Sequence, residues 1–178
     1  MSYTRKLSGE KIYLSSMNIE DMNKYIRWMD NPEVAVVIGI YEENSNPDAA
    51  REYVEKCIRD SDMHFAIVRE DNDTLIGNIG LENSNRTASS TTVRFFIGDR
   101  ENRGKGFGTE ALRLVCHYAF EELHKRNIYL WATDYDEQSI SVYEGVGFAE
   151  AGRLPDCIRI EDKYYDKILM ELNPSSLK

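Results

Sequence analysis

Cysteine, proline and long apolar runs are scarce in this chain, and each scarcity excludes a class of protein. Its 178 residues include three cysteines and four prolines. Cys57, Cys116 and Cys157 are widely spaced and form neither a CxxC pair nor a zinc-ligand pattern. This spacing excludes a disulfide framework and a structural zinc site. We therefore expect reduced, buried thiols, no metal cofactor and a cytoplasmic protein.

Membrane and export signals are missing as well. The N-terminal sequence "MSYTRKLSGEK" has no apolar signal core, and no apolar run approaches the length of a membrane span. We therefore expect no membrane partner.

Basic residues are too few for a nucleic-acid-binding protein. The chain has 22 lysines and arginines against 31 acidic residues, which gives a formal net charge of -9. Phosphate backbones require a basic surface, so we expect no nucleic acid partner. An acidic surface steers cationic substrates such as amines, but it is also common among soluble proteins with other functions.

The hydrophobic pattern predicts one mixed α/β domain over residues 1–178, without repeats or linkers. A meander comes first and a strand–helix–strand unit, which requires parallel strands, comes second. Asn18 is placed to cap the first helix, with Asp21 at capping-box distance, and the last helix is expected to close at Gly145 and Gly147. We expect strands over 11–15, 63–69, 75–82, 91–97, 128–133, 149–154 and 164–172, and helices over about 17–29, 48–60, 109–125 and 136–148.

The segment "NRGKGFGTE" at 102–110 places a basic, glycine-rich loop directly before a long helix. Glycines in such a cluster let the backbone come close to another group. The first turn of a helix offers unpaired N–H groups and the positive end of a dipole, which together suit a phosphate.

Three interpretations of this loop compete on the residues alone. A Walker P-loop does not fit, because Gly106 follows Lys105 where Ser or Thr is required. A dinucleotide fingerprint fits better at Gly106, Gly108 and Ala111, but only about 70 residues remain for a doubly wound sheet. A tight strand-to-helix turn without a ligand is the third interpretation.

The sequence also resembles the GCN5-related N-acetyltransferases (GNAT family). Residues 103–108 match the R/Q-x-x-G-x-G/A signature of that family, and "VYEGVGF" follows about 35 residues later. The resemblance covers roughly residues 8–173 and is strongest from 93 onward, in the branch of ribosomal-protein N-terminal acetyltransferases and spermidine acetyltransferases. It implies a mixed, mostly antiparallel sheet with a central splayed pair of parallel strands, flanked by helices. Residues 93–148 would form the part that binds acetyl-CoA.

The resemblance assigns a role to the loop and to the strand before it. Backbone N–H groups of the loop and helix start would hold the pyrophosphate of coenzyme A. The end of the strand would carry a bulge, pair with the pantetheine arm and supply an N–H to the acetyl carbonyl. These cofactor-binding residues would be Phe96, Ile97, Gly98, Arg103, Gly104, Lys105, Gly106, Phe107, Gly108 and Thr109. Core packing alone is an alternative explanation for Phe95 and Phe96.

Tyr143 occupies the tyrosine position of the motif "Y-x-x-x-G-F". In the family this tyrosine protonates the departing coenzyme A thiolate, which suits a phenol with a pKa near 10. The alternative is a tyrosine that only packs its helix on the sheet.

Two positions depart from the family pattern. Asp136 stands where the family has an asparagine that binds pantetheine, and Ser139 or Gln138 could remake that contact. Thr92 stands where many relatives carry a glutamate that serves as a base or holds water. Glu82, on the neighbouring strand, is then a candidate catalytic base, with His64 and ordered water as alternatives. Glu82 could equally be a surface charge without a catalytic role.

Together these residues imply acetyl transfer from acetyl-CoA to a primary amine, by direct attack in a ternary complex. None of the cysteines is placed like a covalent relay. The acceptor stays open among polyamines, protein or peptide N-termini, aminoglycosides and amino-acid-like amines. We expect the first 60 residues, particularly 34–46, to shape its pocket. Four residues there could line a cation site or simply cover a helix: Trp28, Tyr41, Glu42 and Glu43. A non-catalytic acyl-CoA sensor on the same fold remains an alternative, and such domains are compatible with a homodimer.

Overall fold

The predicted strands join one mixed sheet in the computed structural model, which describes residues 3–31, 34, 47–59, 63–84 and 87–178. Eight strands follow the order β1-β2-β3-β4-β5-β6-β8-β7. Their bounds are β1 Arg5–Ser8, β2 Ile12–Ser16, β3 His64–Arg69, β4 Leu75–Glu82, β5 Ser90–Ile97, β6 Asn127–Thr133, β7 Ala149–Ile160 and β8 Lys163–Leu172. The helices are α1 Met22–Met29, α3 Pro47–Arg59, α4 Phe107–Glu121 and α5 Glu137–Val146, with short 3-10 turns at Ile19–Asp21, Arg100–Asn102 and Pro174–Ser176.

The sheet is mostly antiparallel, as predicted. β3 and β4 form the expected hairpin, and β1–β2, β2–β3, β6–β8 and β7–β8 are also antiparallel. β5 and β6 are parallel, with Ser90, Thr91 and Thr92 opposite Asn127, Ile128 and Tyr129. The connection between these two strands is α4, so the predicted strand–helix–strand unit is confirmed.

The chain divides into two compact units. The first contains Met1–Leu81 and Arg94–Leu114, and the second contains Glu82–Val93 and Val115–Lys178. β5 and α4 each contribute residues to both units. We describe each unit by itself.

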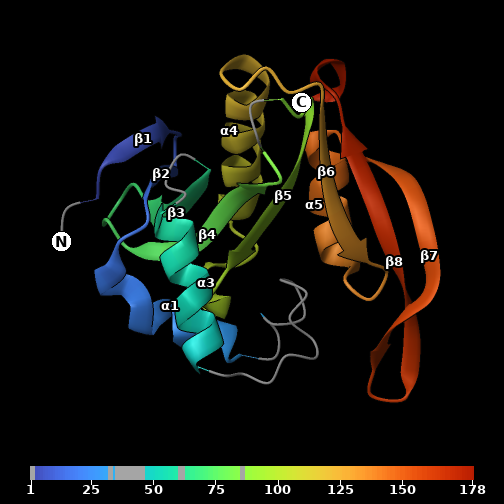
Figure 1. Cartoon of the computed structure of the whole chain (residues 1–178), viewed down its shortest axis with the longest axis horizontal. Helices are drawn as coiled ribbons and strands as arrows, with labels where there is room; N and C mark the ends of the chain where they lie inside the picture. The colour runs from blue at the N-terminus through green and yellow to red at the C-terminus, as the bar shows by residue number, and fades with distance from the viewer. Residues whose placement is uncertain (1–2, 32–33, 35–46, 60–62, 85–86) are drawn as a thin grey trace. The chain divides into compact units, whose positions relative to one another are not determined.

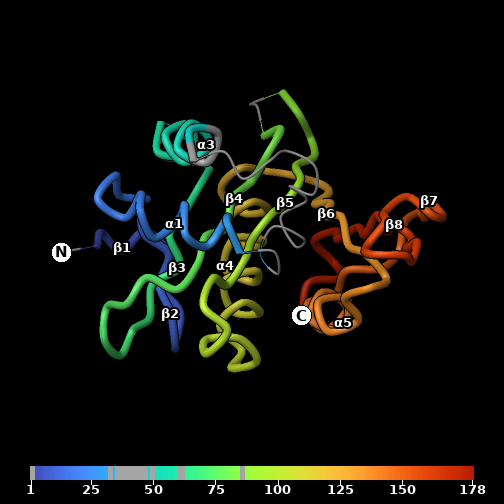
Figure 2. The backbone as a smooth tube through the Cα atoms, turned by 90° about the horizontal axis from the view of Figure 1, so that it is seen from below, coloured from blue at the N-terminus to red at the C-terminus, as the bar shows by residue number. Residues whose placement is uncertain are grey.

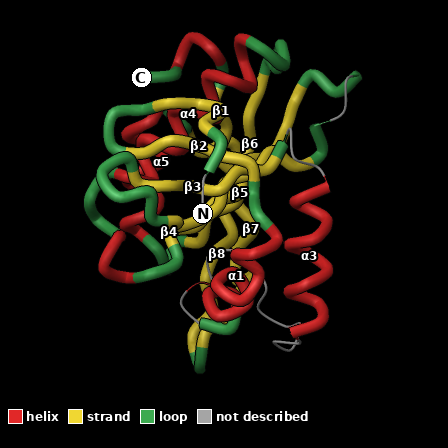
Figure 3. Tube along the Cα trace, turned by 90° about the vertical axis from the view of Figure 1, so that its left-hand side faces the viewer, coloured by secondary structure: helices red, strands yellow, loops and turns green. Residues whose placement is uncertain are grey.

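In the first unit, α1 and α3 lie side by side (Figures 1 and 3) and share one apolar core with the strands. This core forms because α1 presents its apolar residues at helical spacing toward Tyr13, Ala66 and Val68, which point to the same face of their strands. Phe96 of β5 joins it, with its ring 5.9 Å from that of Trp28.

The start of α1 differs in detail from the prediction. Asn18 does act as a cap, since its side chain accepts a hydrogen bond from the N–H of Glu20, but this cap opens the 3-10 turn before α1. Asp21 makes no side-chain cap bond to the helix. Its carboxylate instead accepts the hydroxyl of Tyr3, with oxygen distances of 3.0 and 3.1 Å. A long-range partner therefore took the place of the predicted capping box.

In the second unit, β7 and β8 run alongside each other (Figure 2), and α5 buries Tyr143 and Val146. α5 ends at Gly147, whose φ of 115° is a left-handed conformation that favours glycine. Gly145 lies inside the helix, so the expectation that it closes the helix was wrong.

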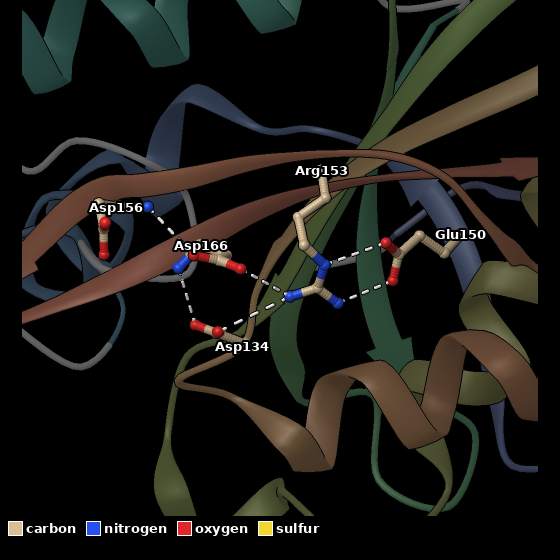
Figure 4. Close-up of polar contacts among 5 residues, drawn as sticks. All are labelled: Asp134, Glu150, Arg153, Asp156 and Asp166. Atoms are coloured by element: carbon tan, nitrogen blue, oxygen red, sulfur yellow. Dashed lines mark hydrogen bonds and ion pairs between the residues drawn. The ribbon is translucent and has the colours of Figure 1, made fainter.

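An ion cluster ties the loop after β6 to the β7–β8 hairpin (Figure 4). The Arg153 guanidinium lies 2.8 Å from Glu150, 3.0 Å from Asp166 and 3.7 Å from Asp134. Asp134 also accepts the backbone N–H of Asp166 at 2.9 Å, and Asp166 accepts that of Asp156 at 3.0 Å. These bonds hold the segment that leads into α5.

The cysteines divide into two kinds. Cys57 and Cys116 are free and buried, as expected, but Cys157 is exposed on β7. The sequence offered no sign of this, because β7 extends six residues beyond the predicted run 149–154, to Ile160, and most of it is exposed.

Among the helices of the described ranges, none is long and apolar enough to cross a membrane.

Candidate active site

The glycine-rich loop lies in the first unit and leads directly into α4. Gly104 and Gly106 adopt positive φ values of 71° and 85°, and Gly104, Lys105 and Gly106 are exposed. An L-residue in this conformation is strained, so glycine is required here by the backbone and not by crowding. The exposed loop agrees with a backbone that is open to a ligand.

The start of α4 provides donors. Its first helical hydrogen bond runs from the N–H of Glu110 to the carbonyl of Gly106, at 3.0 Å. The N–H groups of Phe107, Gly108 and Thr109 therefore precede the helical ladder and have no partner within the helix. Together with the helix dipole they favour an anion at this end.

Two cations near the loop come from distant parts of the chain, Lys11 just before β2 and Arg69 at the end of β3, and were missed by sequence reasoning. The Lys11 ammonium lies 3.4 Å from the carbonyl oxygen of Lys105. Arg69 of β3 lies over the ring of Phe107, 5.4 Å from its centroid, and also pairs with Asp71. No local pattern marks either residue, because both meet this region through contacts between residues far apart in sequence, as when the backbone N–H of Lys11 donates to the Glu110 carboxylate of α4 at 3.0 Å.

Arg103, the first residue of the family signature, also has a structural role, which the signature alone did not predict. Its guanidinium donates to the carbonyl of Ile97 at 3.0 Å and to that of Gly98 at 2.9 Å. The N–H of Gly98 donates in turn to Ile76, at 2.9 Å. Arg103 thus fixes the end of β5, where the acetyl group is expected to bind.

Phe95 and Phe96 point to opposite faces of β5, as a strand requires. Phe96 is buried in the core beside Trp28, whereas Phe95 lies near Gly108 at the start of α4. Core packing therefore accounts for Phe96, which leaves only its backbone as a candidate contact for the cofactor.

Tyr143 lies in the second unit, on α5, and is 6% exposed. Burial raises the pKa of its phenol to about 12, the Asp136 carboxylate adds to this, and a hydrogen bond with Ser139 lowers the pKa. Its ring packs edge-on against Phe148, with centroids 6.4 Å apart. The phenol therefore stays protonated at neutral pH, as a proton donor must.

Asp136 caps α5, and Ser139 engages both of its carboxylate oxygens. Oδ1 accepts the backbone N–H of Ser139 at 3.0 Å, and Oδ2 accepts its hydroxyl at 2.5 Å. Asp136 and Ser139, two of the candidate pantetheine contacts, are thus bound to each other.

The candidate bases lie on separate units. Glu82 ends β4, is half-buried and belongs to the second unit, where its backbone carbonyl accepts the hydroxyl of Thr91 at 2.9 Å. His64 is buried on β3 in the first unit, opposite Gly80. Thr92 pairs in register with Tyr129. These contacts give no specific support to Glu82 or to His64 as the catalytic base.

Most of the expected acceptor pocket, residues 35–46 with Tyr41, Glu42 and Glu43, falls outside the described residues. Val34 and Trp28 are both buried in the core of the first unit. Trp28 is 2% exposed, and Lys24 already lies over its ring at 5.0 Å. The expectation that Trp28 lines a cation site for a substrate was therefore wrong.

Comparison with known proteins identifies the family. The chain is 35% identical to "Probable N-acetyltransferase YjcK" of Bacillus subtilis over 124 residues, which cover 69% of this chain and 68% of that protein. It is 27% identical to "Putative ribosomal N-acetyltransferase YdaF" of Bacillus subtilis over 155 residues, covering 87% and 79%.

A solved structure has the same fold. The spermidine N-acetyltransferase of Vibrio cholerae, in complex with CoA and spermine, superimposes with a TM-score of 0.81 at 24% identity, covering 94% of this chain and 98% of that one. The family model described as "Acetyltransferase (GNAT) domain" matches residues 11–149. Since that match spans most of the sequence, the chain belongs to the GNAT family of acetyltransferases.

Proposed function

We propose that this acetyltransferase moves the acetyl group of acetyl-CoA directly to a primary amine, with Tyr143 as the proton donor. The observation that supports acetyl-CoA as the acetyl donor is the exposed loop in which Gly104 and Gly106 take positive φ values immediately before α4. That geometry suits a pyrophosphate, and acetyl-CoA is the donor that the family implies.

The loop residues are proposed to bind the cofactor mainly through the backbone. The N–H groups of 104–109 would face the pyrophosphate, while Lys105 adds charge, and Lys11 adds a second cation at the same loop. Phe96, Ile97 and Gly98 would supply backbone contacts to pantetheine and the acetyl carbonyl.

Direct attack is favoured over a covalent enzyme intermediate. The amine nitrogen bonds to the thioester carbon, the carbon–sulfur bond breaks as the intermediate collapses, and the thiolate takes the Tyr143 proton. Cys116 is fully buried and its pKa is raised by burial, so its thiolate is not available as a relay. Glu82 remains our proposed base for the proton that the amine loses, with His64 or water as the alternative.

We propose a small-molecule amine as acceptor, in the wider class that includes polyamines. Two observations support this: the net charge of -9, which attracts cations, and the fold likeness to an enzyme whose structure holds spermine. A protein or peptide N-terminus is the competing acceptor, because YdaF is described as a ribosomal N-acetyltransferase.

We further propose a cytoplasmic location, since reduced thiols without a disulfide suit that compartment.

The test is release of free coenzyme A thiol with acetyl-CoA and a panel of amines: spermidine, amino acids, peptides with varied N-termini and an aminoglycoside. One amine class should give thiol, and Tyr143→Phe should reduce its kcat at least about tenfold. Tyr13→Phe is the matched control, because Tyr13 is also buried with a pKa of about 12 but bonds to Asp73 in the first unit. Binding of acetyl-CoA without thiol release from any amine would favour the sensor alternative.

A further inference from the structure

The turn between β1 and β2 is fastened to the first turn of α4 by one carboxylate. The backbone N–H groups of Glu10 and Lys11 both donate to Glu110, and the Lys11 nitrogen lies 3.0 Å from Oε1. Gly9 packs directly against this carboxylate, since a Cβ at Gly9 would overlap Oε1. Residues 9–11, which we call the anchored turn, therefore lie beside the start of α4, and all of these residues belong to the first unit.

The anchored turn brings a cation to the glycine-rich loop. The Lys11 ammonium lies 3.4 Å from the carbonyl oxygen of Lys105 and 3.6 Å from the point where a Cβ of Gly106 would stand. The Lys11 side chain is exposed, and among the described residues it forms no ion pair. Arg69, in contrast, is already paired with Asp71. The charge of Lys11 is therefore available to an anion at the loop.

The place of Glu110 is unexpected on charge alone. An acid in the first turn of a helix is favourable to the helix dipole, but this acid lies close to the loop that is proposed to hold a pyrophosphate. A carboxylate there repels a phosphate. The bonds to the anchored turn give this carboxylate a role that compensates for the repulsion, because they bring Lys11 to the loop.

We propose that Lys11 binds a phosphate of acetyl-CoA, and that Glu110 is a positioning residue that holds Lys11 at the loop. This inference rests on the proposed binding of acetyl-CoA by the loop. It adds the anchored turn to the cofactor site, although Lys11 stands 94 residues before Lys105 and outside the family signature. An ammonium suits this role because it binds phosphate oxygens as a point charge.

Lys11→Gln tests the cation. Equilibrium binding of acetyl-CoA should weaken about two- to fivefold, as for exposed charge pairs, and should depend less on salt. Lys56→Gln is the matched control, because it makes the same change at an exposed lysine of α3 in the same unit and should alter neither quantity.

Acetyl-CoA that lacks its 3′-phosphate distinguishes the two sources of phosphate. If the loss caused by Lys11→Gln persists with this ligand, Lys11 binds the pyrophosphate. If the loss disappears, Lys11 binds the 3′-phosphate. If Lys11→Gln binds both ligands as tightly as the wild type does, the proposal is wrong.

Glu110 is tested by the sign of its effect. If Glu110 acted through charge alone, Glu110→Ala would remove a repulsion and tighten the binding of acetyl-CoA. We expect binding to weaken about twofold instead, because the anchored turn loses its partner. Glu110→Gln should keep most of the affinity, since its amide oxygen still accepts the N–H groups. Glu101→Ala removes an exposed acid just before the loop, and it should bind acetyl-CoA equally or more tightly.

The double variant separates positioning from a general loss of stability. In the Lys11→Gln background, Glu110→Ala should have no further effect on binding, because the residue that Glu110 positions is gone. A merely structural role would lower stability in urea and weaken binding equally in both backgrounds. Tighter binding by Glu110→Ala, or additive losses in the double variant, would overturn the proposal. A wild type that does not bind acetyl-CoA would overturn the proposed function itself, and this inference with it.

Discussion

The indole nitrogen of Trp28 donates a hydrogen bond to the Asp99 carboxylate, with 2.8 Å between Nε1 and Oδ1. Gly98, which precedes Asp99, packs directly against the indole, and a Cβ at that position would overlap the ring. The end of β5 is thus held both by Trp28 of α1 and by Arg103. A helix far away in sequence therefore positions the strand end where the acetyl group is expected to bind.

Trp28→Phe should destabilise the protein and weaken acetyl-CoA binding. The change removes the bond to Asp99 and part of a buried ring, which together cost about 1–3 kcal/mol. Urea unfolding and the thermal shift caused by acetyl-CoA measure the two effects. Trp131→Phe is the control, because Trp131 is 43% exposed on β6, and equal losses from both variants would contradict the argument.

Gly104→Ala should impair acetyl-CoA binding by straining the loop. No heavy atom lies within 4 Å of a Cβ built there, so the effect comes from the positive φ alone and costs about 1–2 kcal/mol. Equilibrium binding of acetyl-CoA is the measurement.

Gly145→Ala is the matched control for Gly104→Ala. A Cβ built at Gly145 also meets no heavy atom within 4 Å, but Gly145 lies inside α5, so alanine should stabilise the protein by about 0.5–1 kcal/mol. Unchanged binding of acetyl-CoA by Gly104→Ala would show that the loop does not need this conformation.

The sequence was sufficient for the elements whose signal is local. β4 was predicted to the residue, and α4 was predicted from its apolar face and the glycines before it. The cap at Asn18 was also found, since it depends on a residue two positions away. These features could be predicted because each is stabilised mainly by neighbours along the chain.

What the sequence could not give depends on tertiary contacts. Lys11 meets Lys105 across 94 residues, and Asp21 bonds to Tyr3 instead of its own helix. The bonds between Asp136 and Ser139, by contrast, have the local spacing of a helix cap and could have been predicted from the sequence.

Tyr25→Phe should stabilise the protein at neutral pH. Tyr25 is 1% exposed, and within the described residues its hydroxyl has no hydrogen-bond partner. Removing a buried, unsatisfied hydroxyl should raise the free energy of unfolding by about 1 kcal/mol. Urea unfolding measures this, and a loss of stability would indicate a bond that the described contacts do not include.

The same variant should flatten the alkaline loss of stability. Burial raises the pKa of Tyr25 well above its ordinary value of 10.0, so above that pH the unfolded chain releases a proton that the folded protein keeps. Stability then falls by about 1.4 kcal/mol per pH unit for each such tyrosine, and phenylalanine removes this contribution. Tyr164→Phe, at a site that is 62% exposed, should leave the slope unchanged.

Arg153→Gln should lower the melting temperature at neutral pH, because it leaves Glu150, Asp166 and Asp134 close together without their shared cation (Figure 4). Arg153 holds the pKa values of Glu150 and Asp166 below their ordinary values. Its contribution is therefore complete above the unfolded pKa of about 4 and is lost as pH falls through the lower folded values.

Salt and acid distinguish this electrostatic effect from simple loss of packing. The difference in melting temperature between wild type and Arg153→Gln should shrink in about 1 M salt and in acid, since screening and protonation both weaken the repulsion among the carboxylates. Arg159→Gln is the control on the same hairpin, where the arginine is 62% exposed and pairs only with the exposed Asp162 among the ion pairs of the described residues. A deficit that persists unchanged in salt and acid would mean that the side chain of Arg153 acts through packing.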